Sequence, residues 1–369
     1  MRNLSYSSAL RSAAPRSSGG ERERTVTMTP RVGHDLDAVL SAIASPEIAR
    51  VLSGVASAAL PVANLIRWGG LSGAFDAPLG PGHDGTAQKA LDVFADKAFV
   101  NGLKGAGVRG IVSEERDEPV SLDETGTLLL AIDPLDGSNN IDANVSIGTL
   151  FSVLDSPGGG FAPAAFLQRG VAQRAAGFIL YGPHTDFMFT IGSGVHMATL
   201  DPDSNAFRMT GFDLRIPSGT AEFAINASNS RYWPAPVRAY IDDCLEGDEG
   251  PRRRNFNMRW VGSVVADVYR IVVRGGVYLY PQDSREGYEH GRLRLLYEAN
   301  PIAMLIEQAG GVAIDGFNRI LDIAPQSLHM RTPLIFGSKD KVERIAGYYR
   351  DSRAEHEAPL FARRGLLRR

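Results

Sequence analysis

The sequence contains a single cysteine, Cys244, so an intrachain disulfide is impossible and no cysteine pair can bind a metal or act in redox chemistry. It has no uninterrupted apolar run close to the ~18 residues that a membrane span requires, so we expect no contact with a membrane. It also lacks an excess of one charge, because 39 basic residues stand against 42 acidic ones. That balance argues against a nucleic-acid-binding surface. Together these absences indicate a protein of the reducing cytoplasm.

What the sequence does have is length and apolar content. Its 369 residues are 44% hydrophobic, which is enough to bury a sizeable core in two domains or in one large layered unit. Residues 1–20 hold six serines, three arginines and no acid, so we predict a disordered extension over 1–30. Beyond it we predict an N-terminal α/β domain over 31–208, a C-terminal α/β domain over 209–350 and a tail over 351–369.

The spacing of apolar residues predicts alternating helices and strands. Helical spacing runs over 36–43, over 48–55 behind Pro46, and over 91–99, and a Gly- and Pro-rich loop is expected over 69–86. A further helix is expected from Pro301, with Asn300 as its N-cap and Gly310 just past its end. Short apolar runs predict strands at 110–113, 128–132, 149–154, 175–180, 187–191, 222–226 and 277–280. The pattern favours a layered α/β or α+β fold.

An acidic string follows the apolar run 128–132, and it is the strongest chemical signal in the chain. It reads Asp133-Pro134-Leu135-Asp136-Gly137-Ser138-Asn139-Asn140. Its Asp, Pro and Gly residues predict a tight turn that brings Asp133 and Asp136 together. Adjacent carboxylates repel each other unless a cation lies between them, and such hard oxygen ligands suit Mg²⁺ or Mn²⁺. The backbone N–H groups of Gly137 and Ser138 can hold an anion, so the string fits metal-assisted phosphate hydrolysis.

Simpler interpretations exist for each part. Asp-Pro and Asp-Gly pairs usually make solvated turns, and Glu114-Glu115 alone would be a solvated pair at the end of a strand. Glu298 alone would be an acid that stabilises a helix dipole. The complete string behind a buried strand favours the metal site over these alternatives.

Longer motifs resemble a known family. Over about residues 36–349 the chain resembles the class I fructose-1,6-bisphosphatases. The acidic string by itself is also similar to that of the wider group that includes inositol monophosphatases, whereas the third and fourth strings are typical of the fructose bisphosphatases. The four strings are 113–115 (Ser-Glu-Glu), 133–142 (the acidic string with Ile141 and Asp142), 260–268 (Trp-Val-Gly-Ser-Val-Val-Ala-Asp-Val) and 293–301 (Leu-Arg-Leu-Leu-Tyr-Glu-Ala-Asn-Pro).

The resemblance implies a five-layered α/β/α/β/α sandwich that assembles as a homotetramer. It implies hydrolysis of the 1-phosphate of the sugar bisphosphate fructose 1,6-bisphosphate with Mg²⁺, and Mn²⁺ stays open as an alternative ion. Sedoheptulose 1,7-bisphosphate stays open as an alternative or second substrate. Gluconeogenesis and the Calvin cycle stay open as the metabolic setting.

The resemblance also implies roles for single residues. Glu114, Glu115, Asp133, Asp136 and Glu298 would bind metal together with the carbonyl of Leu135. Asp92 and Glu115 would activate the attacking water, and Asp142 would support the reaction electrostatically. Leu135, Gly137 and Ser138 would line the 1-phosphate site, while Asn226, Tyr280, Arg292 and, from a neighbouring subunit, Arg259 would hold the 6-phosphate.

Several of these residues have structural alternatives. Asp92 could belong to a solvated helix face, Tyr280 to the core and Asn226 to a turn. Arg292 stands where the animal enzymes have lysine, and Trp260 stands where they have tyrosine. A non-catalytic sugar-phosphate binder would be expected to have lost a carboxylate, and none is missing here, so the sequence favours catalysis.

Overall fold

The structure, a computed structural model, describes residues 33–72, 78–81, 87–158 and 161–357. The predicted disordered extension at 1–30 lies outside the described residues, as does most of the predicted loop over 69–86. The predicted tail begins at 351, but the last helix, α7 (Lys339–Glu357), continues into it. The part of the tail from 358 on lies outside the described residues.

Three helices form the first layer, as the apolar spacing predicted. They are α1 (Leu36–Ile43), α2 (Pro46–Trp68) and α3 (Ala90–Gly102). Pro46 occupies the first turn of α2, where its missing N–H costs nothing, and Pro61 lies inside the helix without ending it. By length and composition alone, the stretch Pro46–Leu71 would suffice to cross a membrane. The buried residues of α2 belong to the core beneath it, so we interpret α2 as a core helix.

The second layer is an eight-stranded sheet in the order β10-β9-β8-β7-β6-β5-β3-β4. Its pairs are antiparallel except for β3 and β5, which run parallel. All nine residues of β5 are buried, because helices cover both faces of the sheet at its centre. The strands are β3 (Val108–Ser113), β4 (Val120–Ser121), β5 (Leu128–Asp136), β6 (Ile147–Asp155), β7 (Gln173–Tyr181), β8 (Thr185–Thr190), β9 (His196–Asp201) and β10 (Ala206–Gly211).

The remaining layers belong to the C-terminal half. Helices α5 (Val264–Arg274) and α6 (Asn300–Gln308) lie between the large sheet and a five-stranded sheet in the order β12-β11-β13-β17-β15. Helices α4 (Ala235–Leu245) and α7 cover the far face of that sheet. The strands are β11 (Glu222–Ala224), β12 (Asn257–Met258), β13 (Val277–Tyr280), β15 (Val312–Ile314) and β17 (Leu334–Gly337), and two small pairs join β1 (Pro78–Pro81) to β2 (Ala87–Lys89) and β14 (Leu293–Arg294) to β16 (Arg331–Thr332).

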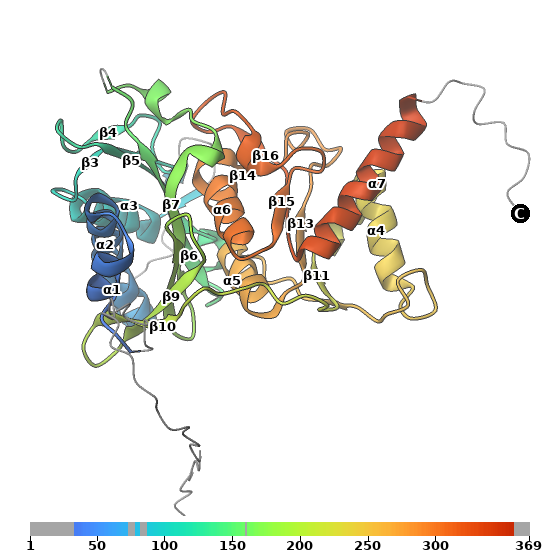
Figure 1. The fold of residues 1–369 in the computed structure, drawn as a ribbon, viewed down its shortest axis with the longest axis horizontal. Coiled ribbons are helices and arrows are strands. Elements are labelled where there is room, and N and C mark those ends of the chain that lie inside the picture. The colour runs from blue at the N-terminus through green and yellow to red at the C-terminus, as the bar shows by residue number, and fades with distance from the viewer. Residues whose placement is uncertain (1–32, 73–77, 82–86, 159–160, 358–369) are drawn as a thin grey trace, which may run out of the picture. The chain divides into compact units, whose positions relative to one another are not determined.

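Alternation along the strands explains how the layers hold together. In β17, Leu334 and Phe336 pack into the core around α5 and α6, whereas Ile335 between them packs toward α4 and α7. Figure 1 shows the resulting succession of helices, sheet, helices, sheet and helices across the molecule. The predicted five-layered α/β architecture is therefore confirmed.

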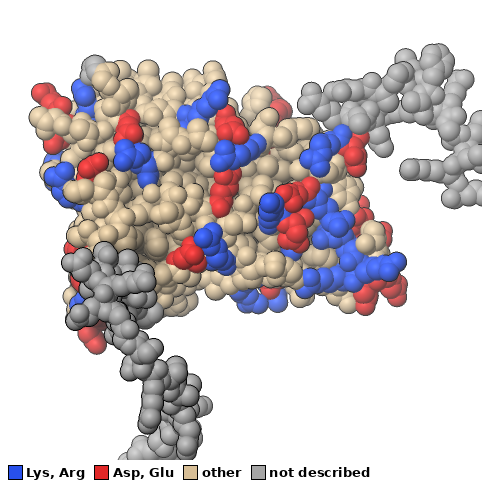
Figure 2. Space-filling model, in the orientation of Figure 1, with Lys and Arg blue, Asp and Glu red and all other residues tan. Residues whose placement is uncertain are grey.

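Contacts join the described residues into one compact unit. The predicted division at 208/209 falls inside β10, and the two-domain description stays a prediction. Figure 2 shows acidic and basic side chains interspersed over this face of the molecule, as their nearly equal numbers suggest.

Candidate active site

Asp133 and Asp136 approach each other through a bulge in β5, not through the tight turn that the sequence predicted. The strand continues to Asp136, and its register against β6 shifts between Asp133 and Asp136. In a regular strand two residues three positions apart point to opposite faces, and an extra residue in a bulge brings them to the same face. Pro134 lies in the bulge, where its missing N–H breaks no ladder. The hydroxyl of Thr149 donates to the Pro134 carbonyl at 2.8 Å and holds the bulge in place.

Glu298 reaches the same place from the C-terminal half. It lies in a π-helical turn, Leu295–Ala299, directly before α6. Pro301 has no N–H for the carbonyl four residues earlier, which explains why the regular helix begins only at Asn300. The prediction that Asn300 caps this helix is therefore wrong, because helical backbone already precedes it. The Arg294 backbone N–H donates to Glu298 Oε2 at 2.6 Å and orients the carboxylate.

Asp133, Asp136 and Glu298 together form a set suited to a metal ion. All three are buried, and one carboxylate oxygen from each lies within 4.8 Å of the others. Burial raises the pKa of Asp133 and Glu298 well above the usual range, and the neighbouring acids raise it further. Burial likewise raises the pKa of Asp136 to about 7. Because crowded, buried carboxylates are costly without a cation, this set fits an oxygen-binding ion such as Mg²⁺.

Asp92 adds a carboxylate with an unused oxygen. It lies in the first turn of α3 and is 1% exposed, so it does not belong to a solvated helix face. Its Oδ2 accepts the Lys89 backbone N–H at 2.8 Å, while Oδ1 is buried without a hydrogen-bond partner among the described residues. Burial raises the pKa of Asp92 to about 6. A buried acceptor facing a pocket is suited to a water molecule or a metal.

The acids described so far line one pocket. Glu114 and Glu115, at the end of β3, line it as well. Glu114 forms an ion pair with Arg294 of β14, a residue of the fourth motif for which the sequence predicted no role. Arg331 of β16 is the register partner of Arg294 in the two-stranded sheet of β14 and β16, and it lines the same pocket. An arginine four residues before the proposed metal ligand Glu298 was the signal that could have identified Arg294.

The segment after the bulge continues along the pocket. Gly137 adopts φ +80°, a conformation that suits glycine, and it lines the pocket together with Ser138 and Asn139. The Asn140 amide donates to the Gly262 carbonyl at 3.0 Å, and the Val265 N–H donates to Asp136 Oδ2 at 3.3 Å. These contacts join the acidic string to the start of α5, whose N-terminal N–H groups also favour negative charge.

A second group of lining residues forms an aromatic and cationic wall of the pocket. Tyr280 of β13 lies beside Arg292, with 3.5 Å between the tyrosine hydroxyl and Nη1 of the arginine. The guanidinium of Arg292 also lies over the ring of Tyr288, 3.8 Å from its centre. Trp260 stacks on Tyr278 and completes the wall. The cavity between the acidic and cationic walls measures about 430 Å³, which is the size of a small-molecule site.

Three predicted residues do not line this pocket. Asn226 accepts a hydrogen bond from the Ser228 N–H and lines a small separate cavity that shares Tyr280 with the pocket. The side chain of Arg259 is 53% exposed and lies 3.7 Å from Glu222. Asp142 forms an ion pair with Lys89 at 3.4 Å. Their assigned roles therefore stay predictions.

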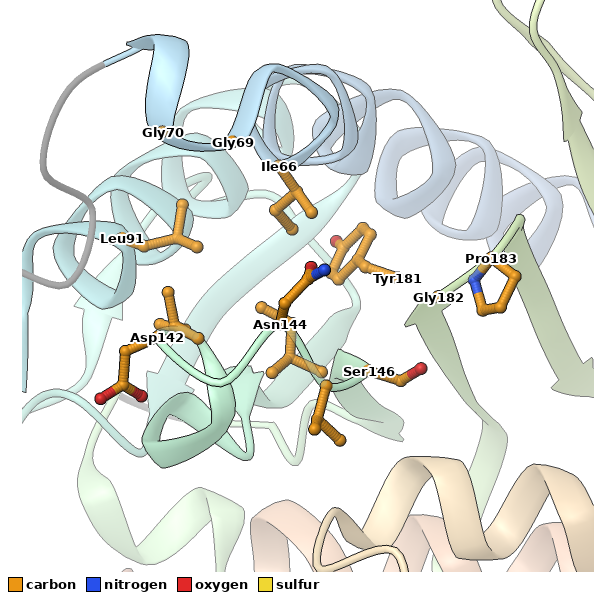
Figure 3. A pocket seen from close by; sticks show the side chains of 13 residues that line it. Ile66, Gly69, Gly70, Leu91, Asp142, Asn144, Ser146, Tyr181, Gly182 and Pro183 are labelled. Carbon is orange, nitrogen blue, oxygen red and sulfur yellow. The ribbon is translucent and has the colours of Figure 1, made fainter.

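Asp142 instead borders a larger cavity of about 800 Å³ beside the end of α2 (Figure 3). Leu91, Tyr181 and Ile66 supply much of its wall. Among the described residues that line it, Asp142 alone carries a charge. This cavity therefore has no set of metal ligands, and the smaller pocket is the candidate active site.

Comparison with known proteins identifies the chain. The family profile for the N-terminal domain of fructose-1-6-bisphosphatase matches residues 33–211, and that for the C-terminal domain matches residues 216–350. The chain is 53% identical over 323 residues to a class 1 fructose-1,6-bisphosphatase of Paracoccus denitrificans, covering 88% of this chain and 96% of the relative. A class 1 enzyme of Sinorhizobium medicae is 49% identical over 328 residues, or 88% and 94% of the two chains. The crystal structure of holo Leishmania major fructose-1,6-bisphosphatase superposes with a TM-score of 0.81 at 31% identity, over 87% of this chain and 100% of that one.

Proposed function

Because the chain belongs to the fructose-1,6-bisphosphatase family, we propose that it hydrolyses the 1-phosphate of fructose 1,6-bisphosphate in the pocket between the acidic and cationic walls. The observation that carries the proposal is the polarity of this pocket. Its lining brings together the buried acids Asp133, Asp136 and Glu298, which suit a metal ion, and Arg292 between two tyrosines, which suits a phosphate. A substrate with a phosphate at each end matches both walls.

At the acidic end, Asp133, Asp136 and Glu298 would hold Mg²⁺, with Glu114, Glu115 and the Leu135 carbonyl as further ligands, and Mn²⁺ would suit the same oxygen donors. When bound, such an ion neutralises phosphate charge and lowers the pKa of water. Backbone N–H groups of the chain hold two of these carboxylates in place. Val265 fixes Asp136 from one side and the Arg294 N–H fixes Glu298 from the other.

Asp92 and Glu115 are the proposed bases. The open Oδ1 of Asp92 is available to accept a proton from a water molecule that attacks phosphorus. A pKa of about 6 keeps this carboxylate mostly ionised above neutral pH and close to the pH at which general bases work best. Gly137 and Ser138 would hold the phosphate from the backbone side, and Asp142 would act at longer range from beside the pocket.

At the cationic end, Arg292 and Tyr280 would bind the 6-phosphate, with Asn226 close behind Tyr280. The proposed role of Arg259 requires a neighbouring subunit, because within one chain this arginine lies outside the pocket. We therefore propose a homotetramer of the family type. Mixing Asp136→Asn subunits with Arg259→Ala subunits should restore activity in hybrids, since each supplies what the other lacks. No recovery on mixing would contradict a shared site.

The direct test is phosphate release by the purified protein with Mg²⁺. Its substrates would be fructose 1,6-bisphosphate, sedoheptulose 1,7-bisphosphate, fructose 1-phosphate and inositol 1-phosphate. We expect a preference for fructose 1,6-bisphosphate that EDTA abolishes. Equal turnover of the monophosphates would contradict the role of the cationic wall, and no turnover of any substrate would favour a sugar-phosphate binder. The single cysteine is buried, which supports placing the enzyme in a reducing cytoplasm.

A further inference from the structure

We propose that Tyr288 is a positioning residue for the distal phosphate, acting by holding Arg292 in the pocket. This inference rests on the proposed function and adds a residue to the same site. Tyr288 belongs to none of the motifs that identify the chain. It lies in the loop between β13 and β14, and its side chain lines the pocket beside Arg292 and Trp260.

Arg292 needs such support because no carboxylate holds it. It forms no ion pair with any acid among the described residues, and its nearest polar contact is the Tyr280 hydroxyl at 3.5 Å. Arginine has many rotamers, and an arginine without a fixed partner would spread over several of them. The rings of Tyr288 and Tyr280 attract its guanidinium at 3.8 Å and 5.8 Å from their centres. Aromatic faces restrain the cation without neutralising it, so its N–H groups stay available for an anion.

Tyr288 is in turn held from the protein side. The guanidinium of Arg285 lies 4.9 Å from the centre of its ring and 4.7 Å from that of Tyr232. Arg285 is tied to Asp283 by hydrogen bonds from Nε of 3.0 Å and 3.2 Å. The backbone supports this arrangement, because Asp283 donates its N–H to the Tyr288 carbonyl at 3.1 Å. The two arginines beside Tyr288 thus differ, since Arg285 forms an ion pair with Asp283, whereas Arg292 forms none among the described residues and feels the charge of Asp283 only at longer range.

The test replaces Tyr288 with leucine and with phenylalanine. We expect Tyr288→Leu to raise the KM for fructose 1,6-bisphosphate about tenfold with little change in kcat, because only the restraint on Arg292 is lost. Tyr288→Phe keeps the ring and should stay within about twofold of the wild type. The KM for fructose 1-phosphate, which has no distal phosphate, should not change. Binding of fructose 6-phosphate, measured by calorimetry, should weaken by the same factor as the KM rises.

Two controls separate this role from a general effect on the fold. Tyr232→Leu removes a ring that contacts Arg285 but not Arg292, and it should leave the KM nearly unchanged. In an Arg292→Ala background, Tyr288→Leu should have no further effect, because the residue through which it acts is gone. The inference is overturned if Tyr288→Phe is as impaired as Tyr288→Leu, or if the loss persists in that background. A wild-type protein without bisphosphatase activity would instead contradict the proposed function itself, while fructose 6-phosphate binding would still report on Tyr288.

Discussion

The acidic and cationic walls of the pocket are built in different ways. Asp133 and Asp136 come from a fully buried strand of the large sheet, where a bulge and the Thr149 hydroxyl fix the backbone. Arg292 comes from the end of a loop, and side-chain stacking on Tyr280 and Tyr288 restrains it. The acidic wall is held by backbone geometry, and the cationic wall by aromatic contacts.

This contrast has a functional consequence. Reaction chemistry depends on carboxylates held in a fixed arrangement, and a bulge in a buried strand provides that. Binding the remote phosphate needs a cation whose charge is unpaired but whose position is restrained, and tyrosine rings provide that. We therefore expect changes at the acidic wall to lower kcat and changes at the cationic wall to raise the KM.

The largest effect is expected at the acidic wall. Asp136→Asn should lower kcat by about a thousandfold or more, because it removes a ligand charge from the metal set while keeping the side-chain volume. The same variant should not lose thermal stability in EDTA at pH 8, since a buried carboxylate with a raised pKa is replaced by a neutral group. Steady-state kinetics and calorimetry measure both effects. Asp203→Asn, at an exposed turn acid, is the control, and a variant that kept a tenth of its activity would contradict the metal assignment.

A smaller effect is expected at the cationic wall. Arg292→Ala should raise the KM for fructose 1,6-bisphosphate by about ten- to a hundredfold, the value of a charge-assisted hydrogen-bonding group, with a minor change in kcat. Turnover of fructose 1-phosphate should be unaffected. Arg231→Ala removes an exposed arginine that stacks only on Tyr232, and it serves as the matched control. An equal loss with both substrates would mean that Arg292 supports the fold and not the distal phosphate.

The smallest effect is expected in how the melting temperature depends on pH. It reports on the acids of the pocket and needs no activity assay. Burial raises the pKa of Asp92 to about 6 and that of Asp136 to about 7, so the folded state binds more protons than the unfolded state between pH 4 and 7. In EDTA the melting temperature should therefore fall as the pH rises from 5 to 7.5. Mg²⁺ should remove most of this slope by binding the ionised acids.

A part of that slope should remain with Mg²⁺ present. Burial also raises the pKa of Asp267 to about 6, and this residue, which is not part of the metal set, accepts hydrogen bonds from Arg270. Calorimetry over this range with EDTA and with Mg²⁺ measures both contributions. A melting temperature in EDTA that rises with pH would contradict the raised pKa values.

The sequence predicted the acids of the acidic wall, and the family resemblance added Tyr280 and Arg292 of the cationic one. The acidic string is contiguous, and its position after a fully apolar run was visible without the fold. The prediction of a tight turn was wrong, because the sequence alone does not distinguish a turn from a bulge that continues the strand. Tyr288 was not predicted at all, since a tyrosine in a polar loop has no pattern that shows which side chain it will contact.

By itself, the sequence determined the first three helices, the strands at the centre of the large sheet, the family, and the presence of carboxylates that suit a metal ion. Local periodicity and turn chemistry depend on residues that are neighbours along the chain, so the sequence shows them directly. Only the tertiary structure decided that Glu298 meets Asp133 and Asp136, that Asp92 keeps one oxygen open, and that Arg292 lies on Tyr288. The reason is that burial and proximity arise when distant segments pack together, and they set both the pKa of an acid and the partner of a cation.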